Sequence, residues 1–259
     1  MWKPKLVALD LDGTLVTTDD SIPDDVADAV RAAARAGARI VIATGRGWHA
    51  VRPHVDTLGL PAGPHVVSNG AVVVRYPPLH IDDLITFDLA PVIARVLEEH
   101  PQALLAVEKV GEGYLVSDHF PAGELGGQVE QVSIEELGAH HGPRLVVRDP
   151  DASDGEFIRL AERMGMAGVS YSIGYTAWLD IAPEGVNKAT GLASVAERLR
   201  IDPADVLAIG DGRNDIEMLT WAGRGVTFAD SPPEVIDAAD AVVVPFADGG
   251  TAAELRRWF

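Results

Sequence analysis

Two carboxylates that directly follow an apolar segment constrain this chain more than any other feature of its sequence. Residues 6–9 read Leu-Val-Ala-Leu, which is typical of a buried strand, and Asp10-Leu11-Asp12-Gly13-Thr14 follows at once. Such carboxylates are costly unless a partner offsets their charge, and Mg²⁺, which binds carboxylates and phosphate oxygens together, is the simplest partner. Gly13 lets the backbone turn sharply. By itself the motif is equally compatible with a solvated strand end and a turn.

A second strand with a similar polar ending is predicted one helix later. The helix covers residues 24–36 and ends at Gly37, and the apolar run 38–43 leads into Thr44-Gly45-Arg46. A strand, helix and strand joined in this order form a right-handed parallel unit. Asp10 and Thr44 are therefore expected at the same edge of one sheet, where open α/β sheets bind ligands.

The middle of the chain has a different pattern from its two ends. Short strands and hairpins are predicted over residues 82–182, whereas strands and helices alternate again from residue 183, with a helix from Lys188 and a strand at 205–209. We therefore predict an α/β fold, with a doubly wound Rossmann-like parallel sheet formed by residues 1–81 and 183–259. Residues 82–182 are predicted to form an inserted α+β cap domain, with helices at residues 90–100 and 154–164 among its elements.

Polar residues of complementary type stand at the ends of these predicted elements. Phosphoryl transfer needs a nucleophile, a proton donor, a hydroxyl, a fixed positive charge and oxygen ligands for a metal ion. Each residue has an ordinary explanation when taken alone, because a lysine at a helix start is usually solvated and a polar loop residue is often a helix cap. Their order along one predicted sheet edge favours the functional interpretation: Asp10, Asp12, Thr44, Lys188, Asp211 and Asp215.

Four strings of this sequence resemble the motifs of the haloacid dehalogenase-like phosphohydrolases. They are Asp10-Leu11-Asp12-Gly13-Thr14, Ala43-Thr44-Gly45-Arg46, Gly185-Val186-Asn187-Lys188 and Gly210-Asp211-Gly212-Arg213-Asn214-Asp215. The string Ser68-Asn69-Gly70-Ala71 and the large insert resemble the Cof-type branch, whose cap is of class IIB. Residues 225–231 depart slightly from the family's usual string, which we interpret as a change at the rim of the site.

The resemblance implies a role for each matching residue. Asp10 would attack phosphorus and form a transient aspartyl phosphate, and Asp12 would protonate the leaving alcohol and then activate water. The implied phosphate-binding residues are Thr44, Gly45, Arg46, Asn69, Lys188 and Asn214. The implied Mg²⁺-binding residues are Asp10, Asp12 through its backbone carbonyl, Asp211 and Asp215. Asp215 would either bind the ion directly or contact the residues that bind it. The cap would act as a lid that selects the substrate.

Composition narrows the class of partner. The formal net charge of −18 argues against nucleic-acid binding, which requires a positive surface, and no apolar run reaches the roughly 20 residues of a membrane span. The absence of cysteine and of a signal-peptide pattern favours a cytoplasmic protein. The expected partner is a small phosphorylated metabolite, such as a sugar phosphate or a similar phosphomonoester. No sequence feature indicates the oligomeric state.

Alternatives remain open at this stage. A phosphomutase, or a phosphatase dedicated to one sugar or osmolyte pathway, would share the core chemistry. A non-catalytic receiver-like module would also use an Asp, a Thr, a Lys and a metal ion, but the large insert and the second acid, Asp12, oppose it. Candidate substrate contacts in the cap are Glu108, Lys109, Tyr114, Arg148 and Tyr175. Four histidines without ligand spacing are interpreted as surface or structural residues: His49, His54, His140 and His141.

Overall fold

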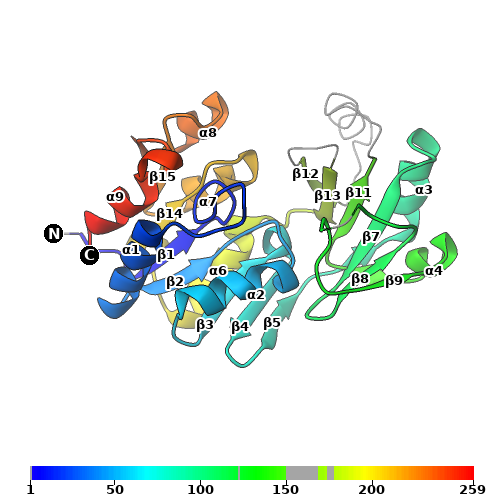
Figure 1. The fold of residues 1–259 in the computed structure, drawn as a ribbon, viewed down its shortest axis with the longest axis horizontal. Helices are drawn as coiled ribbons and strands as arrows, with labels where there is room; N and C mark the ends of the chain where they lie inside the picture. Colours follow the sequence, from blue (N-terminus) through cyan, green and yellow to red (C-terminus); the bar gives the residue numbers. More distant parts are fainter. Residues whose placement is uncertain (1, 122, 150–168, 174–177) are drawn as a thin grey trace. The chain divides into compact units, whose positions relative to one another are not determined.

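The computed structural model describes residues 2–121, 123–149, 169–173 and 178–259 (Figure 1). The chain forms two compact units. The core unit comprises the residues up to Arg46, Val51–Asp83 and Asn187–Phe259, and the inserted unit comprises Gly47–Ala50 and Leu84–Val186. Among the described residues, no helix combines the length and the apolar character that a bilayer crossing requires.

A five-stranded parallel sheet forms the centre of the core unit. The strand order is β16-β15-β14-β1-β2, and β1 pairs in parallel with both β14 and β2. The strands are β1 (Leu6–Leu9), β2 (Arg39–Ile42), β14 (Val206–Ile209), β15 (Arg224–Phe228) and β16 (Ala241–Val243). Because the chain continues from β1 to one side and later returns to its other side, the carboxyl end of β1 is a topological switch point. The predicted doubly wound α/β fold is confirmed.

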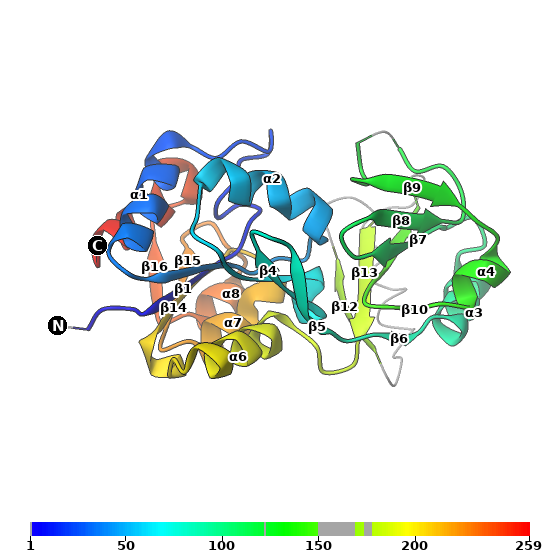
Figure 2. The ribbon, with the colours of Figure 1, turned by 90° about the horizontal axis from the view of Figure 1, so that it is seen from below.

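Helices cover both faces of this sheet (Figure 2). On one side α1 packs against α9, and on the other α6 packs against α7 and α7 against α8. Alternate residues of β1 and β14, including Leu6, Ala8 and Val206, are fully buried against Leu192 and Met218 of the second group. The helices are α1 (Asp24–Arg35), α2 (Trp48–Leu58), α6 (Lys188–Leu199), α7 (Ile216–Trp221), α8 (Pro233–Ala238) and α9 (Gly250–Arg256).

A small antiparallel sheet adjoins β2 through a bridge between Ala43 and Val66. It consists of β3 (Gly63–Val67), β4 (Val72–Tyr76) and β5 (His80–Leu84). The tight turn between β3 and β4 has positive φ at Ser68, Asn69 and Gly70. A Cβ on Gly70 would lie 2.0 Å from the carbonyl oxygen of Asn187, so this turn packs directly on the start of α6.

The inserted unit is built on a six-stranded sheet with the order β12-β13-β11-β7-β8-β9. Its apolar face packs on α3 and α4 through residues such as Leu105, Val147 and Ile93. The elements are α3 (Ala90–Glu99), α4 (Ile134–Gly138), β6 (Phe87–Asp88), β7 (Leu104–Lys109), β8 (Gly113–Val116), β9 (Gln128–Gln131), β10 (His141–Gly142), β11 (Leu145–Arg148), β12 (Val169–Ile173) and β13 (Trp178–Pro183). This α+β architecture is the one predicted.

Some elements were not predicted from the sequence. Strand β9 is fully exposed and reads Gln-Val-Glu-Gln, without an apolar alternation that would mark a strand. Helix α2 carries Pro53 inside it, which weakens its helical pattern. A helix expected at residues 154–164 lies outside the described residues.

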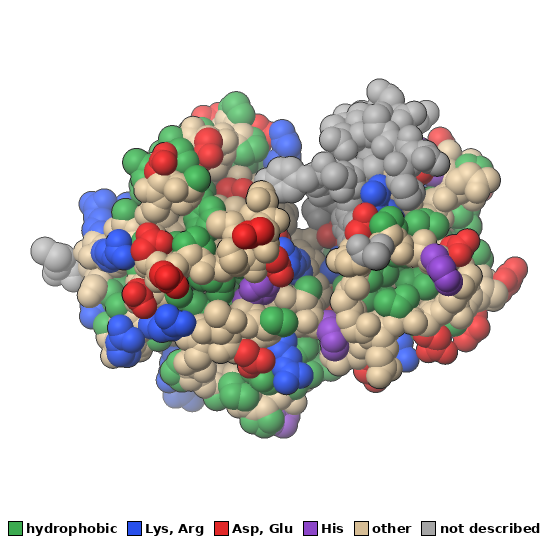
Figure 3. All heavy atoms as spheres, viewed as in Figure 1, with side chains coloured by type: hydrophobic (Ala, Val, Ile, Leu, Met, Phe, Trp, Pro, Cys, Tyr) green, Lys and Arg blue, Asp and Glu red, His purple; other side chains and the backbone are tan. Residues whose placement is uncertain are grey.

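The charge of the core unit is spread over its surface. Both acidic and basic side chains appear on the face drawn in Figure 3. Several of them form ion pairs at the surface, such as Arg213 with Glu234 and Lys5 with Asp205. Each such pair is neutral, so the net charge of −18 reflects the excess of 39 acidic over 21 basic residues.

The contact between the β3–β4 turn and α6 can be tested with a matched pair of glycine substitutions. A Cβ added to Gly70 (φ +97°) would lie 2.0 Å from the Asn187 carbonyl oxygen, whereas a Cβ added to Gly37 (φ +95°) would have nothing within 4 Å. Gly37→Ala should cost only the positive-φ strain, about 1–2 kcal/mol of unfolding free energy. Gly70→Ala should cost about 3–5 kcal/mol, because the strain and a backbone clash add. Equal losses in urea unfolding would show that the contact is unimportant.

Candidate active site

Three neighbouring strands of the core sheet end in the residues predicted to form the site. Leu9 of β1 is in register with Ile42 of β2 and with Ile209 of β14. Asp10, Thr44 and Asp211 follow these strand ends within two residues. The parallel register therefore brings side chains that are about 30 to 200 positions apart in sequence to one sheet edge.

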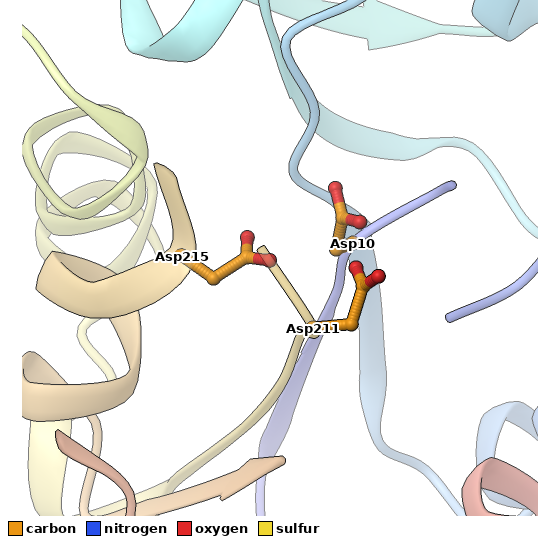
Figure 4. A group of neighbouring side chains, drawn as sticks. All are labelled: Asp10, Asp211 and Asp215. Atoms are coloured by element: carbon orange, nitrogen blue, oxygen red, sulfur yellow. The ribbon is translucent and has the colours of Figure 1, made fainter. Parts of the chain in front are cut away.

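Three carboxylates converge at this edge. Asp10, Asp211 and Asp215 each offer an oxygen atom, and these atoms lie within 4.8 Å of one another. Figure 4 shows the three side chains pointing toward a common space from the ends of β1 and β14 and from the turn that precedes α7. Asp10 and Asp215 are buried.

Glycines permit this close approach. A Cβ on Gly13 would lie 2.4 Å from Asp211 Oδ2, and a Cβ on Gly210 would lie 2.4 Å from Asp215 Cγ. Gly13 also has a φ of +68°, which L side chains rarely adopt. Gly13 and Gly210 are therefore required by the packing of the carboxylates themselves.

Lys188 connects the carboxylates. Its Nζ donates to Asp10 Oδ1 at 2.5 Å and to Asp215 Oδ1 at 2.6 Å, and its side chain is 0% exposed. Lys188 is the first residue of α6, whose start is fixed by a capping box between Asn187 and Thr190. The ammonium group is thus held at a defined helix start.

Burial and mutual repulsion shift the acidity of these groups. Burial, and then the negative charge of Asp215, hold the pKa of Asp10 well above its usual value, although Lys188 acts in the opposite direction. The same two causes raise the pKa of Asp211 to about 6. Burial lowers the pKa of Lys188, but Asp10 and Asp215 outweigh it, so that the pKa rises and the ammonium group stays charged.

The residues present fit a divalent magnesium ion. One ammonium group does not balance three carboxylates, and the surplus negative charge is what a divalent cation offsets. All side-chain donors are oxygen atoms, which Mg²⁺ prefers, and no cysteine is available for softer metals. Asp10, Asp211 and Asp215 would hold the ion.

The carboxylate of Asp12 lies outside this acidic group. It accepts two hydrogen bonds from Arg46, from Nε to Oδ2 at 2.9 Å and from Nη2 to Oδ1. Arg46 also donates from Nη1 to Asp20 Oδ1 at 2.7 Å. Asp20 was not predicted from the sequence, and the only signal for it was a pair of acids, Asp19-Asp20, close behind the first motif.

The remaining predicted phosphate-binding residues lie together. Asn69 N donates to Thr44 O at 3.0 Å, and Asn214 Nδ2 donates to Asn69 Oδ1 at 3.0 Å. A Cβ on Gly45 would lie 3.0 Å from Asn69 Nδ2. The β3–β4 turn is therefore attached both to the loop after β2 and to the loop after β14.

Most of the candidate substrate contacts in the inserted unit have ionic partners. Arg148 pairs with Glu124, and Lys109 pairs with Glu112 at the surface. Glu108 and Tyr114 are buried near Arg144, which donates to Asp180 Oδ1 at 2.8 Å. Tyr175 lies outside the described residues. Of the four histidines, three are exposed (His49, His140 and His141), whereas His54 is buried.

A model of the haloacid dehalogenase-like hydrolase family matches residues 7–255. The chain belongs to this family. It is 33% identical over 247 residues to a phosphoglycolate phosphatase from Natronomonas pharaonis, covering 94% of this chain and 93% of the relative. It is 26% identical to an HMP-PP phosphatase from Cronobacter sakazakii, covering 90% of this chain and 86% of that relative. The predicted family and the predicted enzyme class, a phosphoric monoester hydrolase, are confirmed.

Solved structures agree with this family assignment. A phosphatase of the same superfamily from Bacteroides thetaiotaomicron superposes with a TM-score of 0.80 at 25% identity, covering 99% of this chain and 95% of the other. A sugar phosphatase of subclass IIB has a TM-score of 0.82 at 20% identity, with 98% of both chains covered. The predicted combination of a parallel core with a class IIB cap is confirmed as a fold.

The raised pKa of Asp211 predicts a pH dependence of stability in the metal-free protein. A carboxyl group whose pKa rises on folding, here from 3.8 to about 6, stabilises the native state when protonated and loses that contribution as the pH rises through about 6. From about pH 4 to about pH 7, Asp211→Asn should therefore gain stability relative to wild type. Urea unfolding with EDTA measures this difference, with the exposed Asp24→Asn as control. Parallel pH curves for wild type and Asp211→Asn would contradict it.

Proposed function

We propose that this chain is a Mg²⁺-dependent phosphatase that hydrolyses small phosphorylated metabolites through an aspartyl phosphate on Asp10. The observation that supports it most is the group formed by Asp10, Asp211 and Asp215 around the buried ammonium of Lys188. The names of relatives add support, because they describe phosphatases of phosphoglycolate, of HMP-PP and of a phosphoribitylamino-uracil. These substrates differ, so they favour a class of small phosphorylated compounds and not one compound.

The first step is the attack of Asp10 on phosphorus. Lys188 contacts Oδ1 of Asp10, which leaves Oδ2 for the attack. Burial and the charge of Asp215 raise the pKa of Asp10, and the ammonium of Lys188 acts in the opposite direction, which favours the ionised carboxylate that attacks. A bound Mg²⁺ would supply further positive charge to the carboxylates and the phosphoryl oxygens.

Proton transfer is assigned to Asp12. As the phosphorus–oxygen bond to the alcohol breaks, Asp12 gives its proton to the leaving oxygen, and it later takes a proton from the water that hydrolyses the aspartyl phosphate. Thr44, Gly45, Asn69 and Asn214 would hold the phosphoryl oxygens, since their loops are joined by hydrogen bonds. Arg46 would act beside Asp12, which it contacts through two donors.

We assign substrate selection and exclusion of water to the inserted cap, residues 82–182. An aspartyl phosphate needs protection from unproductive attack by water, and a lid is the common means of providing it. The cap holds buried charged side chains at its sheet, with Glu108 in β7 and Arg144 directly before β11. A panel of phosphorylated metabolites, assayed for phosphate release and for phosphoryl transfer between positions, would identify the substrate and separate a phosphatase from a phosphomutase.

Substitution of the two acids of the first motif should have different results. Asp12→Asn should still be phosphorylated on Asp10 by an aryl phosphate, whose leaving group needs no proton, but should hydrolyse the intermediate at least about 100-fold more slowly. Intact-mass spectrometry would then detect the phosphoenzyme. Asp10→Asn is the matched control: it should form no phosphoenzyme and show no turnover.

Metal removal completes this test. Wild-type turnover of the aryl phosphate should disappear with EDTA and return when Mg²⁺ is added in excess. A single stoichiometric phosphorylation of wild type without continuing turnover would indicate a receiver-like module. Undiminished turnover of Asp10→Asn would exclude Asp10 as the nucleophile.

A further inference from the structure

Arg46 is held by a second acid that the mechanism above does not use. Its Nη1 donates to Asp20 Oδ1 at 2.7 Å, while Nε and Nη2 donate to the two oxygens of Asp12. All three nitrogens of the guanidinium group are thus engaged by two carboxylates. The Arg46 side chain is 28% exposed, so the guanidinium group is partly shielded from water. This shielding strengthens its charged hydrogen bonds to the two carboxylates.

The loop that carries Asp20 is shaped by its own hydrogen bonds. Thr17 N donates to Ser21 O, and Asp20 N donates to Thr17 O, both at 2.9 Å. The Ser21 hydroxyl donates to Asp19 Oδ1 at 2.8 Å, so the side chain of Asp19, the residue before Asp20, is also bound within the loop. The loop therefore presents Asp20 in a defined position before any substrate binds.

The backbone of Asp20 adopts a costly conformation. Its φ is +67°, in the left-handed region, which is unfavourable for most L residues and which Asp and Asn tolerate best. Strained backbone of this kind is frequent at functional sites. Here it coincides with the contact between Asp20 and Arg46.

His54 of α2 lies behind Asp20. Its Nε2 is 3.3 Å from Asp20 Oδ1, the oxygen that also accepts from Arg46, and its side chain is 7% exposed. Burial lowers the pKa of His54, although Asp20 acts against this, so the ring is neutral at neutral pH. His54 Nε2 makes no hydrogen bond to Asp20 or to any other described residue, so the hydrogen bond that Asp20 Oδ1 accepts is the one from Arg46.

We infer that Asp20 is a positioning residue for the acid–base group: it fixes the guanidinium of Arg46, and Arg46 in turn orients the carboxyl of Asp12. This inference rests on the proposed function of Asp12. An arginine bound on one side only can rotate about its long side chain, whereas two anchors fix the plane of its donors. Loss of Asp20 would leave the guanidinium attached to Asp12 alone, and the two groups would move together.

The consequence concerns only the step that needs a positioned proton. In that step the bond between Asp10 Oδ2 and phosphorus forms, the bond from phosphorus to the alcohol oxygen breaks, and this oxygen takes the proton of Asp12. An alkoxide is a poor leaving group and depends on that proton, whereas p-nitrophenolate leaves without it. A residue that acts through Asp12 therefore affects the two kinds of ester differently.

The test is Asp20→Asn, which keeps the shape of the side chain and tolerates the positive φ. Alcohol release is measured in single turnovers with Mg²⁺, using one alkyl phosphate that wild type hydrolyses and p-nitrophenyl phosphate. We expect the alkyl rate to fall about ten-fold or more and the aryl rate to change by less than about two-fold. The unfolding midpoint of the variant, measured in parallel, should stay close to that of wild type, because Asp20 is on an exposed loop.

A matched control and the other outcomes make the test decisive. Asp24→Asn removes the same charge from an exposed acid whose side chain has no hydrogen bond or ion pair among the described residues, and it should change neither rate. Equal losses of Asp20→Asn on both esters, or no loss on either, would overturn the inference. A wild-type protein that releases alcohol from no phosphate ester tested would instead refute the proposed function.

Discussion

The buried ammonium of Lys188 between Asp10 and Asp215 is the interaction on which the site depends. Neither the cation nor the carboxylates could be buried without the other, since removal of one partner from a buried ion pair costs about 3–5 kcal/mol. Asp10 and Lys188 are 178 positions apart in the chain, so their contact forms only when both halves of the core unit have folded together. The chemistry proposed for Asp10 therefore requires the complete core sheet.

The surrounding structure serves the approach of these groups. Gly13 and Gly210 remove the Cβ atoms that would collide with Asp211 and Asp215, and Gly70 removes the one that would collide with the start of α6. The capping box of α6 then fixes where Lys188 begins. Each of these local features is common in proteins. Together they allow the carboxylates and the ammonium group to approach one another without steric clashes.

Much of this arrangement could be predicted from short strings of sequence, and some of it could not. Asp10, Thr44 and Asp211 were predictable at one edge because each follows an apolar strand and parallel strands end on the same side. Strand β9 was not, because Val129 is its only apolar residue and the strand pairs only with β8 among the described residues. Asp20 was also missed, because an acid in a polar loop has no periodicity and its partner, Arg46, is 26 positions away.

The sequence by itself determined the family, the alternation that builds a doubly wound sheet, and the presence of an inserted α+β unit, because these follow from apolar periodicity and from strings of adjacent residues. Only the tertiary structure decided which carboxylates group together. In the folded chain Asp10 lies with Asp211 and Asp215, whereas the carboxylate of Asp12 accepts hydrogen bonds from Arg46. The reason is physical: spacing along a strand fixes the side of the sheet on which a residue lies, whereas the partner of a charged side chain depends on distances between loops that only the folded chain defines.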